Sequence, residues 1–64
     1  MYGTAFMPRH AVVPGTMIKH KGKYWRSSAN LEKGLYALTP SEVTRINSDT
    51  IEVILNQRGL PLIN

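Results

Sequence analysis

The sequence predicts a mainly β domain, a small and partly open barrel of about five short strands with one helical turn. Three observations lead to this fold class. The chain has 64 residues, enough for one domain with a small core. Short runs that alternate apolar and polar residues are separated by turns that contain Pro or Gly. β-branched residues dominate the second half of the chain, which favours strands over helices.

The first nine residues are predicted to form an extended N-terminal arm, and residues 10–64 a single β-rich domain. The arm has no basic start followed by a continuous apolar run, so it does not resemble a signal peptide. Residues 10–13 are a short β-prone stretch. Pro14 and Gly15 then predict a type II turn, because Gly readily takes the positive φ that the third turn position requires.

The best-defined element is a hairpin with strands over residues 16–20 and 23–27 around Lys21-Gly22. A loop of two or four residues places Ile18 opposite Trp25. Side chains alternate between the two faces of a strand, so we expect one apolar face toward the core, made of Thr16, Ile18, Trp25 and Ser27. The opposite face is cationic and holds an aromatic ring, with Lys19 opposite Tyr24 and Met17 opposite Arg26.

Residues 27–34 are polar and turn-rich, and residues 35–38 predict a further strand. The segment after them is expected to form a second hairpin around Ser48-Asp49. That register pairs Ile46 with Ile51, Thr44 with Val53, and Arg45 with Glu52 as a cross-strand ion pair. The capping-box sequence Thr39-Pro40-Ser41-Glu42 then forms only one helical turn, from Pro40 to Val43, before the strand.

The same segment has a helical alternative, a β-hairpin followed by a helix-turn-helix in an α+β fold. The capping box at Thr39, a second one at residues 49–52, and Gly59 with Pro61 are start and stop signals for two short helices. The hairpin agrees better with the strands predicted in the first half of the chain.

Residues 14–25, Pro-Gly-Thr-Met-Ile-Lys-His-Lys-Gly-Lys-Tyr-Trp, resemble the first hairpin of SH3-like and KOW-like small barrels. In those barrels a Gly precedes one strand and a Gly-Lys-aromatic turn leads into the next. The resemblance implies an SH3-like barrel. Residues 21–31 also look similar to the small barrel that follows the catalytic domain of Mu-type transposases. Residues 38–61 resemble the helix-turn-helix of excisionase-type and MerR-type regulators, through a Leu-Thr start, Glu42, Thr50-Ile51 and a closing Gly-Leu-Pro.

The composition excludes several classes of protein. The chain has no cysteine, which rules out disulfides, thiolate catalysis and cysteine zinc sites. A domain this small cannot hold a deep, water-free active site as well as a core, so we expect a non-enzymatic protein without a cofactor. No apolar run approaches the roughly 20 residues that span a bilayer. We therefore expect a cytoplasmic protein with no membrane partner.

The charge is unevenly distributed along the chain. The net charge is +4, but residues 1–30 hold five cations and no acid, whereas residues 31–64 hold three cations and four acids. The two halves thus carry +5 and −1. Net charge bears on partners rather than on fold, and this asymmetry predicts a one-sided basic surface that suits an anionic partner.

The candidate binding residues interleave cations with an aromatic ring in the predicted hairpin: Lys19, Lys21, Lys23, Tyr24 and Arg26, with Arg9 and His20 at the periphery. Proteins that bind single-stranded nucleic acid use such cations for phosphates and such rings for bases. The only Trp, Trp25, is expected in the core. No carboxylate lies at ligand spacing from His10 or His20, so no metal site is expected.

Three function classes stay open. The first is a nucleic-acid-binding protein, with DNA and RNA as alternatives. The second is a small, phage-encoded interaction module or inhibitor that docks on an acidic surface of a larger host protein. The third, tied to the helical alternative, is a helix-turn-helix DNA-binding regulator. The apolar tail at residues 60–63 could pack as a last strand or dock on a second copy, so a homo-oligomer is also left open.

Overall fold

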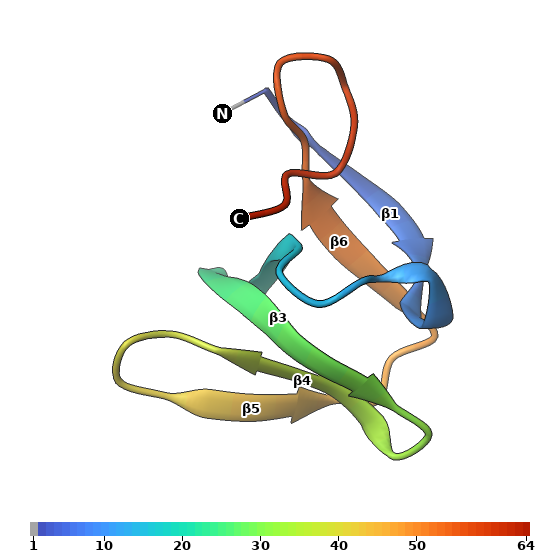
Figure 1. The fold of residues 1–64 in the computed structure, drawn as a ribbon, viewed down its shortest axis with the longest axis vertical. Helices are drawn as coiled ribbons and strands as arrows, with labels where there is room; N and C mark the ends of the chain where they lie inside the picture. Colours follow the sequence, from blue (N-terminus) through green and yellow to red (C-terminus); the bar gives the residue numbers. More distant parts are fainter. Residues whose placement is uncertain (1) are drawn as a thin grey trace.

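The computed structural model describes residues 2–64, which form one antiparallel sheet that curls around its own core (Figure 1). The strands are β1 (Thr4–Pro8), β2 (Met17–His20), β3 (Lys23–Leu31), β4 (Gly34–Leu38), β5 (Val43–Ile46) and β6 (Thr50–Ile54). Their order across the sheet is β1-β6-β2-β3-β4-β5. The only helical element in residues 2–64 is the 3-10 turn η1 (Arg9–Ala11). The predicted mainly β, partly open barrel is therefore confirmed, and the helix-turn-helix alternative is wrong.

The hairpin of β2 and β3 has the predicted register, with Ile18 opposite Trp25 and Lys19 opposite Tyr24. Its loop has two residues, and both have positive φ: 51° at Lys21 and 76° at Gly22. Positive φ at both central positions is the type I′ geometry, whose twist matches that of the flanking strands. The local turn and the period-2 pattern therefore agree on this register.

The hydrophobic core lies on the inner face of the curled sheet and draws on five of the six strands and the segment after η1: Val12, Ile18, Trp25, Leu35, Ala37, Ile46, Ile51 and Val53, with Met7 of β1 packed against them. Two buried polar side chains continue the core toward the predicted type II turn. Ser27 Oγ and Thr16 Oγ1 both donate to the carbonyl oxygen of Val13, at 2.8 and 2.7 Å. Gly15 in this turn has φ +93°, as a type II turn requires. The predicted apolar face of the first hairpin is confirmed.

The second predicted hairpin is wrong, although both of its strands form. β5 pairs with β4, so that Arg45 lies opposite Tyr36 rather than Glu52. β6 lies between β1 and β2, and there Glu52 faces Phe6 on one side and Lys19 on the other. The physical reason is that a strand inside the sheet satisfies its backbone groups on both edges, which a two-stranded hairpin cannot offer. The link at residues 47–49 therefore connects β5, at one end of the strand order, to β6, the second strand from the other end.

Three local expectations also change. The predicted arm is extended, but Thr4–Pro8 pairs along its whole length with β6. The helical turn expected from Pro40 to Val43 is a hairpin loop: Thr39 Oγ1 does accept from the backbone N–H of Glu42 at 3.0 Å, as in a cap. However, Thr39 N–H donates to the Glu42 carbonyl at 2.9 Å, which closes the β4–β5 turn. The helical turn lies instead at η1, where a β-prone stretch was expected.

The remaining segments tie the barrel together. β3 extends through the stretch expected to be a loop, with a bulge between Ser27 and Ala29. The C-terminal segment is tied to the strand ends, because Met17 N–H donates to the Leu62 carbonyl and Leu62 N–H donates to the Ile54 carbonyl, both at 2.8 Å. No helix in residues 2–64 is long and apolar enough to cross a membrane.

Candidate functional site

The outer face of strands β2–β5 collects the most distinctive exposed side chains. Paired residues in an antiparallel sheet project to the same side, so the observed registers place one set of side chains opposite the core. We call this surface the cationic face; its residues are Met17, Lys19, Tyr24, Arg26, Tyr36, Leu38, Val43 and Arg45.

The cationic face holds three exposed cations, Lys19, Arg26 and Arg45, and no acid. The acidic side chains lie elsewhere. Glu42 is in the β4–β5 loop and pairs with Lys23 at 2.5 Å. Glu52 is on β6 and accepts a hydrogen bond of 2.6 Å from Thr4 Oγ1. Glu52 lies directly opposite Lys19, whereas Arg26 and Arg45 have no carboxylate opposite them on the neighbouring strands.

Apolar and aromatic groups lie between these cations. Met17, Arg26, Leu38 and Val43 form one row across four strands, and the Val43 residue is 74% exposed. Beside this row a shallow hollow of about 390 Å³ is lined by Tyr24, Arg26, Leu38 and Pro40, among others. Tyr, Met and Arg are the side chains that protein interfaces favour, while Asp and Glu are depleted there. The face thus combines apolar, aromatic and cationic side chains, with Arg26 between Met17 and Leu38.

The five hairpin residues predicted from the sequence to bind a partner do not all lie on one surface of the structure. Lys19, Tyr24 and Arg26 lie together on the cationic face. Lys21 is at the tip of the turn. Lys23 is on the opposite side, next to Trp25, with its ammonium group 5.9 Å from the centre of the indole ring and paired with Glu42. Three of the five predicted residues therefore share one surface.

The two peripheral residues have structural partners. Arg9 Nη1 donates to Asn30 Oδ1 at 2.9 Å and to the Leu31 carbonyl at 2.8 Å, at the end of β3 that lies far from the hairpin tip. His20 packs edge to face against Trp25, with ring centroids 6.4 Å apart, and its carbonyl accepts from Trp25 Nε1 at 3.1 Å. Burial, and secondly the charge of Lys21, lower the pKa of His20 below 6.5.

Four members of the cationic face were not found from the sequence, and Tyr36 and Arg45 are the two polar ones among them. Arg45 was assigned to an ion pair with Glu52, and Tyr36 was noted only as part of a strand. The β4–β5 register brings both of them to the face, directly opposite one another. The signal that could have found them is the Thr39-Pro40 turn sequence, read as a hairpin loop rather than as a helix start. Within residues 2–64, no group of three or more His, Asp or Glu side chains could hold a metal ion.

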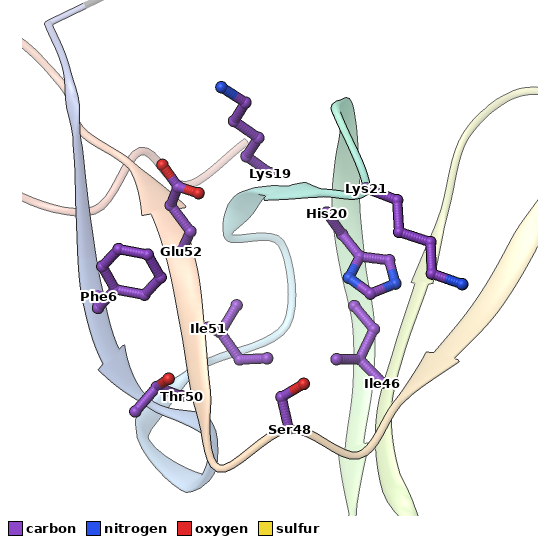
Figure 2. Close-up of a pocket in the computed structure, with 9 residues that line it drawn as sticks. All are labelled: Phe6, Lys19, His20, Lys21, Ile46, Ser48, Thr50, Ile51 and Glu52. Atoms are coloured by element: carbon purple, nitrogen blue, oxygen red, sulfur yellow. The ribbon is translucent and has the colours of Figure 1, made fainter.

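A second hollow, of about 160 Å³, opens on the side where the barrel does not close (Figure 2). Ile46 of β5 and Ile51 of β6 point into this opening from its two sides, and both are buried. His20 lies at one end and Ser48 at the other. The hollow is small and leads toward the core, so it differs in character from the broad cationic face.

The curled antiparallel sheet, its inner core and its open side define a small SH3-type barrel. Residues 2–54 match the family model described as the KilR SH3-type barrel domain. The chain belongs to this family. The match includes every strand and every residue of the cationic face. No curated protein and no solved structure matches the chain.

Proposed function

We propose that this chain is a small interaction module that binds an acidic surface of a larger protein through the cationic face. The observation that carries the proposal is that Lys19, Arg26 and Arg45 share one face with Met17, Leu38 and the exposed Val43, and that strands β2–β5 hold no carboxylate. Small barrel domains of this family are not typically enzymatic, which agrees with a binding role. A phage-like accessory protein that acts on a host protein in the cytoplasm fits the same proposal.

The apolar content of the face favours a protein partner over nucleic acid. Proteins that bind single strands align cations along the backbone path and stack successive bases on several rings. Here the cations are separated by Met17, Leu38 and Val43, and Lys23 is already paired with Glu42. Exposed apolar side chains such as Val43 gain little from phosphates but gain free energy when a protein surface buries them. Nucleic-acid binding, the first prediction from the sequence, stays a prediction.

The test compares two variants of equal net charge. Arg26→Glu/Arg45→Glu alters the cationic face, and Lys33→Glu/Arg58→Glu alters exposed residues outside it. Each pair of reversals lowers the charge by four, from +4 to zero. We expect tagged wild-type protein and the control to retain the same acidic host protein from a lysate, and the face variant to bind that protein at least about tenfold more weakly. Equal weakening in both variants would show that only net charge matters.

Nucleic acid is tested with the same three proteins. Short DNA and RNA are titrated at two salt concentrations, because phosphate contacts make affinity fall steeply with salt. We expect weak binding that is lost at physiological salt, with no difference between the two variants. Tight binding that only the face variant loses would replace the protein partner by nucleic acid.

A further inference from the structure

The sheet has two edges, and they differ in what they expose. β5 is the last strand in the sheet and pairs only with β4. Hydrogen-bonded and non-hydrogen-bonded pairs alternate along an antiparallel ladder, and Thr39 N–H donates to the Glu42 carbonyl just before this ladder. Val43 and Arg45 therefore direct their backbone N–H and C=O groups away from β4. Neither residue makes another backbone hydrogen bond within residues 2–64.

The opposite edge, β1, is blunted. The bonds from Leu55 N–H to the Gly3 carbonyl and from Arg9 N–H to the Asp49 carbonyl bracket the β1–β6 ladder. By the same alternation, the residues of β1 that face outward are Thr4, Phe6 and Pro8. Pro8 has no N–H to donate, and proline on an edge strand is a known device against strand addition. The β5 edge contains no proline, so it is the more open of the two edges of this sheet.

Charge indicates what could occupy the β5 edge. A strand added there would continue the outer face, and its side chains would lie beside Val43 and Arg45. In a strand that alternates acidic and apolar residues, the acidic side chains would lie on the outer face beside Arg45, and the apolar side chains would lie on the inner side beside Thr44 and Ile46. A second copy of this chain would bring two cationic faces side by side, which like charges oppose. In Figure 1 β5 lies below β4 at the lower side of the sheet.

We propose that the acidic partner binds as an added β-strand along β5, through an extended segment that alternates acidic and apolar residues. This inference rests on the proposed function, because it specifies how an acidic protein would reach the cationic face. The backbone groups of Val43 and Arg45 supply the ladder hydrogen bonds, and the Arg45 side chain, beside the added strand on the outer face, selects the charge.

The first experiment uses the full chain, labelled with nitrogen-15, and a capped peptide of four Glu-Val repeats, with a Lys-Val peptide of the same length as control. We expect the acidic peptide alone to bind, and to slow hydrogen exchange at the amides of Val43 and Arg45 by about fivefold or more. The amides of Thr4 and Phe6, on the blunted edge, should not change. Binding without protection at β5 overturns the added strand and leaves the proposed function standing. No binding at millimolar peptide also overturns the added strand, whereas the proposed function is judged by the lysate capture.

The second experiment removes one outward donor. Val43→Pro deletes an N–H that the β4–β5 ladder does not use, and proline is tolerated at such edge positions. We expect affinity for the Glu-Val peptide to fall about fivefold. Phe6→Pro makes the matched change on β1 and should leave affinity unchanged, while Val43→Ala keeps the N–H and should lose less than the proline variant. Thermal unfolding checks that each variant is folded. Equal losses in Val43→Ala and Val43→Pro would overturn the proposal, because the side chain alone would then explain them.

Discussion

The outer face of the sheet differs in composition between strands β2–β5 and strands β1 and β6. On β2–β5 it carries three exposed cations beside the apolar side chains of Met17, Leu38 and Val43, and no acid. On β1 and β6 it carries Glu52 between Phe6 and Lys19, and Thr4 donates to that carboxylate at 2.6 Å. The same region is covered further by the C-terminal segment, where Leu62 N–H donates to the carbonyl of the buried Ile54. The outer side of β1 and β6 is covered and hydrogen-bonded within the chain, whereas the cationic face of β2–β5 is exposed.

This difference shows that charge must be counted by surface rather than by segment. Lys23 belongs to the half of the chain that carries +5, yet it lies off the cationic face and pairs with Glu42. Arg45 belongs to the half that carries −1, yet the β4–β5 register places it on the face opposite Tyr36. A basic half and a basic face are therefore two different sets of residues.

The largest predicted effect comes from disrupting the strand pair that brings Arg45 to the face. Gly34 has φ +145°, and a Cβ there would lie 2.7 Å from Asn47 Oδ1 and 3.0 Å from the Ile46 carbonyl oxygen. Gly34→Ala combines backbone strain with this clash, so we expect a loss of about 3 kcal/mol. That is most of the roughly 3–5 kcal/mol that such a core supplies. Urea denaturation measures the loss.

Gly59→Ala is the matched control, because Gly59 also has positive φ, +77°, but nothing within 4 Å of the added Cβ. It should cost about 1 kcal/mol. If the two variants lose equal stability, the close approach of β4 to β5 is not what requires Gly34.

A smaller effect is expected when the hydrogen bond between β1 and β6 on the outer face is removed. Thr4→Val removes the donor to Glu52, and a partly exposed hydrogen bond to a carboxylate contributes about 1 kcal/mol. Thr50→Val, on the exposed outer side of β6, is the control and should change the free energy of unfolding by less than about 0.5 kcal/mol. The capture of a partner by the cationic face should be the same in both variants. A Thr4→Val protein that lost capture would mean that β1 and β6 belong to the binding surface.

The first hairpin could be predicted because its information is local. The two-residue loop Lys21-Gly22 and the alternation around it select one register, which the structure confirms. The pairing of β5 and β6 could not be predicted in the same way. Period-2 alternation identifies which side chains face the core, but Ile46 and Ile51 suit a local hairpin as well as they suit their real, distant partners. The error was in the choice of partner strand, while the inward faces of Ile46, Ile51 and Val53 were compatible with both.

The candidate site was likewise predictable where one local hairpin defines it and not where distant strands do. Lys19, Tyr24 and Arg26 could be grouped from the sequence, because one hairpin register relates them. Tyr36 and Arg45 join them only through two further registers, one of which contains the bulge between Ser27 and Ala29. Each additional strand adds a register that the local pattern leaves open. Sequence reasoning therefore found the part of the face that lies on β2 and β3 and missed the part on β4 and β5.

The tip of the first hairpin offers a stabilising change. Lys21 has φ 51°, a conformation that Asn tolerates better than Lys. Lys21→Asn should raise the free energy of unfolding by about 0.5 kcal/mol. Because Lys21 is at the tip and not on the cationic face, partner capture should stay at the wild-type level. Lys33→Asn is the control for the lost charge. A weakened capture in Lys21→Asn alone would extend the binding surface to the hairpin tip.

The smallest effect is a dependence on pH that belongs to the inner side of the hairpin. Burial and then Lys21 lower the pKa of His20 below the 6.5 of the unfolded chain, so the unfolded state binds more protons below that value. The contribution of His20 to stability is therefore complete above pH 6.5 and declines as pH falls toward the folded-state pKa. Unfolding free energies at pH 7.5 and 5.5 should differ less in His20→Gln than in wild type. Since His20 packs against Trp25 on the inner side, peptide affinity at the cationic face should not follow this titration. A binding curve that shifts with His20 would couple the two sides of the hairpin and remove the distinction between the open face and the satisfied interior.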